Sequence, residues 1–342
     1  MLAQRTISVL LLSLFALLFQ TCITEYELES NRTAGILAIN GRITNDVGPH
    51  YVTLTRTSAK DRISEAESGA EMHLLDDQGN AYSLFQEEPG VYVLPKGSAH
   101  IFPGYAYRLI VELKGQVYET PFQTMRERSA MDAVSYSVED ITQINEFGNE
   151  VVTRVYNVYL DSQFENTGAP QYFKWEASEV YVIDTKDQLE DCYRDEKIDP
   201  QRINIHEAEG GIQVLATHEL IGRRPFNDAF WVKYYTIVDQ YNISEEEYDY
   251  WQKVKKGIEQ AGSIFDIPPG RIRGNITNVT TPEEIVYGYF SVALKTTTRF
   301  SLVRKDFPEP PERVCLNRSL FELPGFCQCR RGIIEPDFFW QE

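Results

Sequence analysis

The chain has 342 residues with 33 basic and 51 acidic side chains, which gives a net charge of −18 at pH 7. Such an acidic surface repels phosphate backbones and anionic headgroups, which excludes nucleic-acid binding and adhesion to lipid through charge alone. The length is sufficient for two domains, each with a core of its own.

The first 21 residues have the pattern of a secretory signal peptide. Arg5 gives a positive start, and the apolar run over residues 7–19 is shorter than the roughly 20 residues that a membrane helix needs. Cys22 stands at the expected cleavage point, which is typical of a bacterial lipoprotein whose cysteine is lipidated. The sequence therefore predicts that acyl chains on Cys22 anchor the protein. The alternative is an ordinary exported protein whose first cysteine is incidental.

Residues 22–34 are polar and acidic without an apolar period, which indicates a flexible tether between lipid and fold. Glu25, Glu27 and Glu29 follow Cys22 closely. They resemble the signal that directs lipoproteins of the phylum Bacteroidota to the cell surface, so we expect an outer-membrane protein facing outward. A periplasmic orientation with a plain solvated tether is the alternative.

Short strand-like runs separated by turn residues fill residues 35–124. Glycine, proline, asparagine and aspartate mark the turns, as in Pro89-Gly90 and Pro103-Gly104. Seven short strands with turns every few residues predict an immunoglobulin-like β-sandwich. The expected strands are 36–43, 51–57, 71–75, 81–85, 91–94, 106–113 and 116–122.

After a polar boundary near residues 125–129, we expect a larger β-rich domain over 129–305. Its runs are long, aromatic and β-branched, which favours wide sheets. A final pair of strands is expected over 285–294 and 299–303. The other expected strands are 133–138, 151–160, 172–183, 211–221 and 229–240.

One amphipathic helix is predicted near residues 245–260. Ser244 and Glu247 form a capping box, and acidic residues occupy the first turn, where the helix dipole favours them. Tyr248, Trp251, Val254 and Ile258 recur at three- and four-residue steps and form one apolar face. We expect this face to pack on a sheet, with a partner-binding helix as the alternative.

Residues 306–342 form a tail rich in proline, cysteine and aromatic residues. Apart from Cys22, the chain has four cysteines, Cys192, Cys315, Cys327 and Cys329, an even number that predicts two disulfides in an exported protein. Three pairings are open. We expect Cys192 to bond to one member of the Cys327/Cys329 pair and Cys315 to the other. A zinc site is the alternative, but the tail lacks the usual ligand spacing.

No sequence motif for catalysis, phosphate binding or cofactor binding is present, so we expect no enzyme activity, cofactor or metal. The five histidines are scattered, which favours packing or surface roles: His50, His73, His100, His206 and His218. Residues 76–80 contain oxygen ligands and a glycine, but they lack the pattern of a calcium loop and favour a hairpin turn. The acidic run over 245–247 needs no role beyond the first turn of the helix.

Several segments occur in an order that resembles one family, the domain-of-unknown-function family 4249 of Bacteroidota outer-membrane lipoproteins. Besides Cys22 and its acidic tether, they are 35–44 (GILAINGRIT), 51–57 (YVTLTRT), 77–82 (DQGNAY), 89–92 (PGVY), 104–109 (GYAYRL), 248–265, 269–276 (PGRIRGNI), 287–292 (YGYFSV) and the cysteine-containing tail that ends in Phe339-Trp340. Members are often encoded beside TonB-dependent outer-membrane transporters. The resemblance implies an accessory lipoprotein and carries over no catalytic residue.

These observations lead to a main hypothesis and two alternatives. The main one is a non-enzymatic lipoprotein that binds a nutrient or assists a TonB-dependent transporter, with an exposed aromatic patch as supporting evidence. The first alternative is a structural or adhesion protein of the envelope, or an accessory to secretion. The second is a hydrolase with a carboxylate pair in a cleft.

Overall fold

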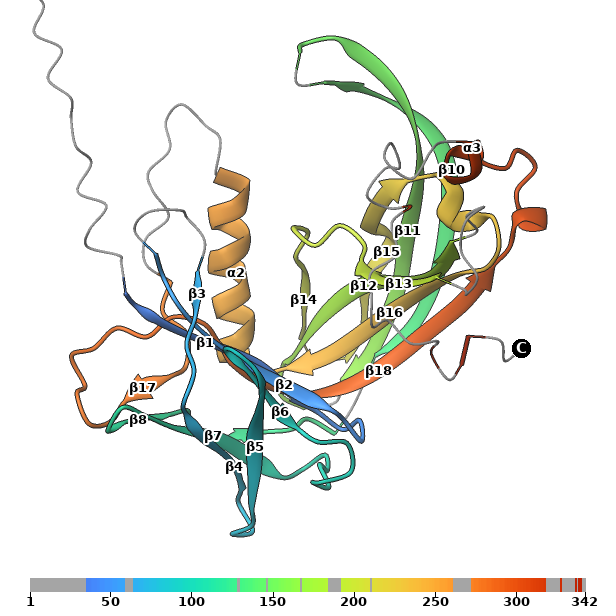
Figure 1. The fold of residues 1–342 in the computed structure, drawn as a ribbon. Coiled ribbons are helices and arrows are strands. Elements are labelled where there is room, and N and C mark those ends of the chain that lie inside the picture. The colour runs from blue at the N-terminus through green and yellow to red at the C-terminus, as the bar shows by residue number, and fades with distance from the viewer. Residues whose placement is uncertain are drawn as a thin grey trace, which may run out of the picture.

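The computed structural model describes residues 35–58, 64–127, 130–145, 147–166, 168–183, 192–209, 211–260 and 272–317, and the single residues Cys327, Pro336, Phe338 and Phe339. The predicted signal peptide, Cys22 and the tether lie outside these residues. The described chain is mainly β with one long helix, as the sequence predicts (Figure 1).

All seven strands expected in the first half of the chain are present, with boundaries shifted by a few residues. Two further strands of two residues each, β3 and β9, accompany them. The strands are β1 (Leu37–Thr44), β2 (His50–Arg56), β3 (Glu65–Ala66), β4 (Glu71–Asp76), β5 (Ala81–Glu88), β6 (Val91–Leu94), β7 (Ala106–Leu113), β8 (Gln116–Glu119) and β9 (Gln123–Thr124).

The second half has longer strands, several of them beyond ten residues. It also contains the long helix α2 (Glu245–Gln260) and the short helical elements η2 (Asp228–Phe230), η3 (Arg304–Asp306) and α3 (Val314–Asn317). The strands are β10 (Met131–Ile144), β11 (Glu150–Asn166), β12 (Gln171–Ile183), β13 (Cys192–Lys197), β14 (Asn204–Ala208), β15 (Gly211–Pro225), β16 (Tyr234–Ile243), β17 (Thr277–Asn278) and β18 (Phe290–Leu302).

Strand β5 belongs to both sheets of the first unit. Its first half pairs with β4, and its second half pairs with β6. The two sheets enclose a core of alternating inward residues, because successive side chains of a strand point to opposite faces. In β7, for example, Tyr107, Leu109 and Val111 are buried in this core, as their alternation predicts. The immunoglobulin-like connectivity itself stays a prediction.

The chain returns to the first unit after α2. Strand β17 pairs with β8, and Ile276, Val286, Phe290 and Val292 are part of the first core. Residues 272–293, which the sequence analysis assigns to the second domain, therefore pack in the first unit. Sequence order does not reveal this, because a strand of two residues carries no periodic signal.

The return path requires close backbone approach. A Cβ on Gly274 would lie 1.5 Å from the carbonyl oxygen of Gly288, and a Cβ on Gly288 would lie 2.1 Å from the carbonyl oxygen of Ile39. Gly288 also has a φ of +90°, which favours glycine. Gly274 and Gly288 thus stand at a place where three backbones meet.

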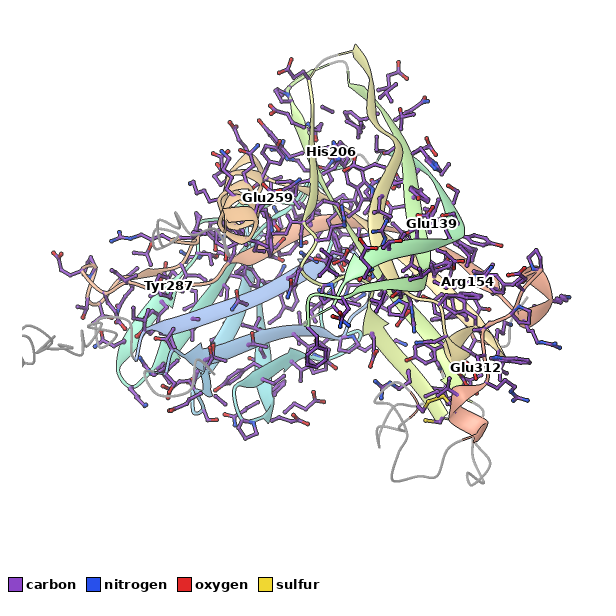
Figure 2. All side chains as sticks on the ribbon, turned by 90° about the horizontal axis from the view of Figure 1, so that it is seen from above. Glu139, Arg154, His206, Glu259, Tyr287 and Glu312 are labelled. Carbon is purple, nitrogen blue, oxygen red and sulfur yellow. A yellow bond between two sulfur atoms is a disulfide. The ribbon has the colours of Figure 1, made fainter. Side chains whose placement is uncertain are left out.

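The second unit consists of two sheets around an aromatic core. One is the end of a 15-stranded sheet, with the order β13-β12-β16-β18 and with β14 paired to β12, and it continues from β18 into the strands of the first unit. The other has the order β10-β11-β15. Side chains crowd the space between the two sheets (Figure 2). The buried core there includes Tyr156 of β11, Trp175 of β12 and Phe230 of η2. Strands that are far apart in the sequence thus contribute side chains to one core.

Strand β18 joins the two units. Its first residues pair in parallel with β1, and the rest pairs antiparallel with β16. The expected pair of strands over 285–294 and 299–303 is wrong, because the polar residues between them continue the strand. Thr297 illustrates the reason: its hydroxyl donates to Asp239 of β16 at 2.6 Å.

The helix α2 confirms the predicted helix near 245–260. The Ser244 hydroxyl oxygen accepts a hydrogen bond from the backbone N–H of Glu247 at 3.1 Å. Tyr248 and Trp251 pack against a small cluster of buried residues that includes Tyr241 and Ile243. Ile258, near the end of the predicted apolar face, is 43% exposed. The first half of the helix therefore provides the packing, beside the sheet in Figure 1.

The tail is held to the second unit by a disulfide and by side chains. Cys315 and Cys327 are bonded, with their Cα atoms 5.5 Å apart. The Asp228 carboxylate accepts hydrogen bonds from the backbone N–H groups of Val314 at 2.9 Å and Cys315 at 2.7 Å. Phe307 is buried in the aromatic core.

A long hairpin arm rises from the second unit in Figure 1. Pro225, at the end of β15, pairs with Val155, so the parts of β10 and β11 beyond this point form a ribbon of two strands. At its tip, Asn145 Oδ1 accepts from the backbone N–H of Phe147 at 3.0 Å and of Asn149 at 2.9 Å. This turn presents Phe147, which is 78% exposed.

Candidate functional site

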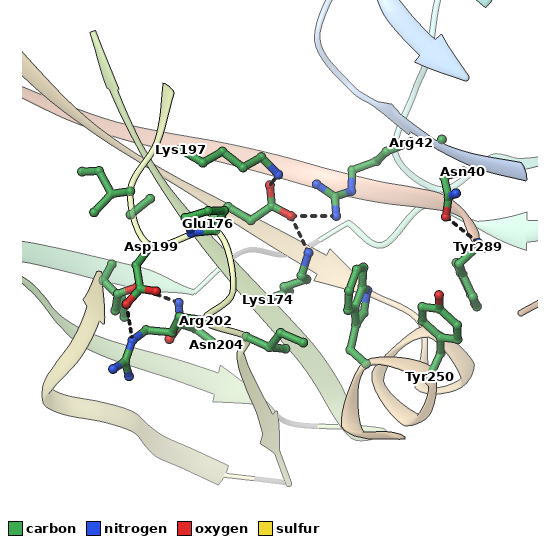
Figure 3. Close-up of a pocket in the computed structure, with 17 residues that line it drawn as sticks. Asn40, Arg42, Lys174, Glu176, Lys197, Asp199, Arg202, Asn204, Tyr250 and Tyr289 are labelled. Atoms are coloured by element: carbon green, nitrogen blue, oxygen red, sulfur yellow. Dashed lines mark hydrogen bonds and ion pairs between the residues drawn. The ribbon is translucent and has the colours of Figure 1, made fainter. Parts of the chain in front are cut away.

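A cavity of about 280 Å³ opens where α2 faces the junction of the two units. Its charged and aromatic lining comes from β1, β12, the end of β13, Asp199 and Arg202 after it, Tyr289 and α2 (Figure 3). Because β1 belongs to the first unit and β12 to the second, neither unit forms this cavity alone. The lining residues that matter most are Arg42, Lys174, Glu176, Lys197, Tyr250 and Trp251.

Glu176 lies at the centre of an ion-pair network. Its carboxylate accepts hydrogen bonds from Arg42 Nη2 at 3.1 Å, from Lys197 Nζ at 3.1 Å and from Lys174 Nζ. Burial by itself would raise the pKa of this carboxyl, but the three cations hold its pKa well below the usual range. Glu176 is therefore ionised throughout the physiological range.

Lys174 is the most buried charge in the network, with its side chain 6% exposed. Its Nζ lies 3.9 Å from the centroid of the Trp251 ring, within cation–π range. Burial, followed by the positive charge of Arg42, lowers the pKa of Lys174 to about 8 in spite of Glu176. The lysine is thus protonated at neutral pH and titrates in mildly alkaline solution.

Aromatic side chains of α2 form another wall of the cavity. The ring of Tyr250 lies 5.3 Å from that of Trp251 and 5.0 Å from that of Tyr289, measured between centroids. Tyr250 and Trp251 belong to the first half of α2, which lies beside the cavity in Figure 3. The planes of the Tyr250 and Trp251 rings stand at 76° to each other, so the site combines several cations with an angled aromatic wall.

Glu247 has a different place from its neighbours in the acidic run. Glu245 and Glu246 are exposed, whereas Glu247 is 1% exposed and accepts hydrogen bonds from Ser291 Oγ at 2.6 Å and Trp251 Nε1 at 3.1 Å. It therefore fixes the orientation of the Trp251 ring. This role is not evident from the sequence, because a buried and an exposed glutamate in a first helical turn look alike.

The predicted cysteines are disulfide-bonded where the structure describes them. Cys315 pairs with Cys327, as one of the expected arrangements requires, and Cys192 is also disulfide-bonded. Cys22 and Cys329 lie outside the described residues. Each of the three described cysteines is buried, which protects its disulfide from reductants.

The other residues that were considered from the sequence do not come together in one site. Among the described residues, no group of three or more histidine, cysteine or acidic side chains has the arrangement of a metal site. Asp76 accepts hydrogen bonds from the backbone N–H of Gln78 and Asn80 and from the side chains of Asn80 and Tyr82. Residues 76–80 are thus the hairpin turn between β4 and β5, as predicted.

The charged residues of the cavity are not among the site residues predicted from the sequence. Lys174 and Glu176 are two of the three charges in β12, a strand that is otherwise largely apolar, and their spacing places both on one face. That pattern is a usable signal for a buried ion pair. Arg42 and Lys197 carry no such signal, because each is an ordinary charge in a strand with several polar residues.

Comparison with known proteins gives one result. The profile of the domain of unknown function DUF4249 matches residues 23–299. No curated protein and no solved structure matches the chain. In the part of the chain that the structure describes, no helix is long and apolar enough to cross a membrane. Since the matched region covers most of the sequence, the chain belongs to the family defined by the domain of unknown function DUF4249.

Proposed function

We propose that the protein is a lipoprotein anchored to the outer membrane through Cys22, and that it serves a TonB-dependent transporter as a non-enzymatic, ligand-binding accessory. The cavity between the two units carries this proposal. It has an excess of positive charge in an acidic chain and an aromatic wall, a combination suited to holding a small ligand. The Cys22 leader and the acidic residues that follow it support the location.

The partner is tested in native membranes. The tagged full chain is extracted from the outer membrane in mild detergent, and the co-purifying proteins are identified and quantified. A TonB-dependent barrel in stoichiometric amount supports the accessory role. A monomer without a barrel contradicts it.

The anchor is tested by Cys22→Ser. We expect the variant to leave the membrane pellet while keeping the melting temperature of the wild type, because Cys22 precedes every strand and helix that the structure describes. Retention of the folded variant in the pellet would refute lipid anchoring.

The arm favours a second candidate, an adhesion or structural role in the envelope. Ile144, Phe147 and Val152 are 75%, 78% and 70% exposed near its tip, and exposed apolar groups of this kind often contact a partner. Under this alternative, Phe147→Ser lowers surface attachment of cells. Val279→Ser, which changes a 50% exposed valine in the first unit, is the control. Unchanged attachment with Phe147→Ser speaks against this role.

A further inference from the structure

We propose that the cavity binds a small carboxylate borne on a ring, with the carboxylate beside Arg42 and Lys197 and the ring against Tyr250 and Trp251. This inference rests on the proposed ligand-binding function and names the class of ligand. It goes beyond family membership, which specifies no ligand.

The first argument is the charge of the lining. Two carboxylates, Glu176 and Asp199, face the cavity, and Arg202 pairs with Asp199 at 3.1 Å. Glu247 lies behind the lining, with both oxygens already engaged. Even with Glu247 included, one positive charge remains without an acidic counterpart. The cations of the lining are Arg42, Lys174, Lys197 and Arg202.

The second argument is the number of hydrogen-bond donors. Each lysine has three N–H donors and Arg42 has five, whereas one carboxylate offers about four lone-pair sites. Glu176 thus cannot engage all the donors of Arg42, Lys174 and Lys197. Lys197 is 62% exposed and reachable from solvent, and Arg42 is 20% exposed. A second carboxylate would take the donors that remain.

The third argument is the depressed basicity of Lys174. Its pKa of about 8 shows that the surrounding negative charge does not fully compensate for burial and for Arg42. An anion entering the cavity would lower the electrostatic cost of keeping Lys174 protonated. Binding of a carboxylate and protonation of Lys174 therefore reinforce each other, through charge rather than direct contact.

The shape of the cavity selects the rest of the ligand. A volume of about 280 Å³ accommodates one six-membered ring with its substituents rather than an oligomer. Lys174 covers one face of Trp251, and the Tyr250 and Trp251 rings meet at 76°, so they form a corner against which a sugar ring or an aromatic ring can lie. Two classes of ligand carry a carboxylate on a ring: uronic acids and aromatic carboxylic acids.

Isothermal titration calorimetry on the purified full chain with its lipid in detergent micelles tests the proposal. The probes are glucuronate, benzoate, glucose and inorganic phosphate at millimolar concentrations. We expect heat of binding with glucuronate or benzoate, and the stronger of the two identifies the source. Glucose lacks the charge and phosphate lacks the ring, so both should bind more weakly. Absence of binding by both carboxylates, or equal binding of glucose and glucuronate, overturns the proposal.

Two lysine variants show whether the cavity is the site. Lys197→Gln should weaken carboxylate binding about tenfold, the loss expected for one charge-assisted hydrogen bond. Lys114→Gln is the matched control, because Lys114 is 67% exposed and forms an ion pair with Glu67 in the first unit. Equal affinities of the two variants refute the cavity as the site. Because this experiment needs no transporter, its outcome is separate from the test of the accessory role.

Discussion

Glu176 of β12 accepts a hydrogen bond from Arg42 of β1 at 3.1 Å, and this contact joins residues 134 positions apart in the sequence. The two side chains belong to different units of the fold. The ion pair is therefore part of the interface that positions β1 against the second sheet, as well as part of the cavity lining.

Replacement of Glu176 should destabilise the protein strongly. Glu176→Gln leaves Arg42 and Lys174 partly buried without their counter-charge, and the loss of one partner from a buried ion pair costs about 3 kcal/mol. Glu119→Gln, which removes a more exposed pair with Arg108, should cost less than about 1 kcal/mol. Denaturant unfolding measures both. Similar losses in the two variants would contradict the central role of Glu176.

The titration of Lys174 predicts a pH dependence of stability. In the folded protein this lysine loses its proton near pH 8, whereas in the unfolded chain it does so near its ordinary pKa of 10.5. Between these values the unfolded state binds more protons, so this group makes the free energy of unfolding rise with pH. Arg42, Glu176 and Glu247 face Lys174. The pKa of Arg42 is raised and that of Glu176 is lowered, so both keep their charge over this range.

The comparison of wild type with Lys174→Met isolates this effect. The stability of the wild type relative to the variant should increase from about pH 8 to about pH 10.5 and stay level below pH 8. Lys114→Met serves as a control for general changes in charge. If the stability of the wild type and of Lys174→Met changed with pH in the same way, the pKa of Lys174 would be the same in the folded and the unfolded protein. That result would contradict the prediction.

Gly274 should tolerate no side chain. A Cβ would lie 1.5 Å from the carbonyl oxygen of Gly288, so Gly274→Ala must displace the backbone that completes the first core. We expect a loss above about 3 kcal/mol, the range of severe packing defects. Gly79→Ala adds a Cβ in open space at a φ of +89° and should cost about 1 kcal/mol from backbone strain alone. Thermal unfolding ranks the two variants, and equal losses would contradict the close approach.

Asp228 should control the attachment of the tail. Its two carboxylate oxygens accept the backbone N–H groups of Val314 and Cys315, so Asp228→Ala leaves both donors without this partner. We expect a loss of about 2 kcal/mol and faster proteolysis within residues 306–317. Asp249→Ala, which changes a residue of α2 far from the tail in sequence, should leave proteolysis of the tail unchanged. An unaltered cleavage rate in Asp228→Ala would argue against this attachment.

Local patterns predicted much of the secondary structure. The turns of the first unit, the alternation in β7 and the helix cap at Ser244 act over a few residues, and each is found in the structure. Of the predicted capping box only the Ser244 half is found, while the Glu247 carboxylate accepts from Trp251 and Ser291. The secondary-structure predictions are wrong where contacts with residues far away in the sequence determine the local structure. Residues 229–233 were expected to begin a strand, but Asp228–Phe230 forms the helix η2, whose Asp228 carboxylate binds the tail. The polar residues in the middle of β18 adopt an extended conformation because they pair with β16.

The sequence by itself determined the mainly β class and the position of the helix, because periodicity and capping are properties of neighbouring residues. The export leader stays a prediction. Only the tertiary structure decided that residues 272–293 complete the first unit and that Arg42, Lys174, Glu176 and Lys197 meet at one cavity. These contacts depend on strand order and on backbone approaches between distant segments. Contacts between distant segments produce no periodic pattern in the sequence, so the candidate site became visible only in the folded structure.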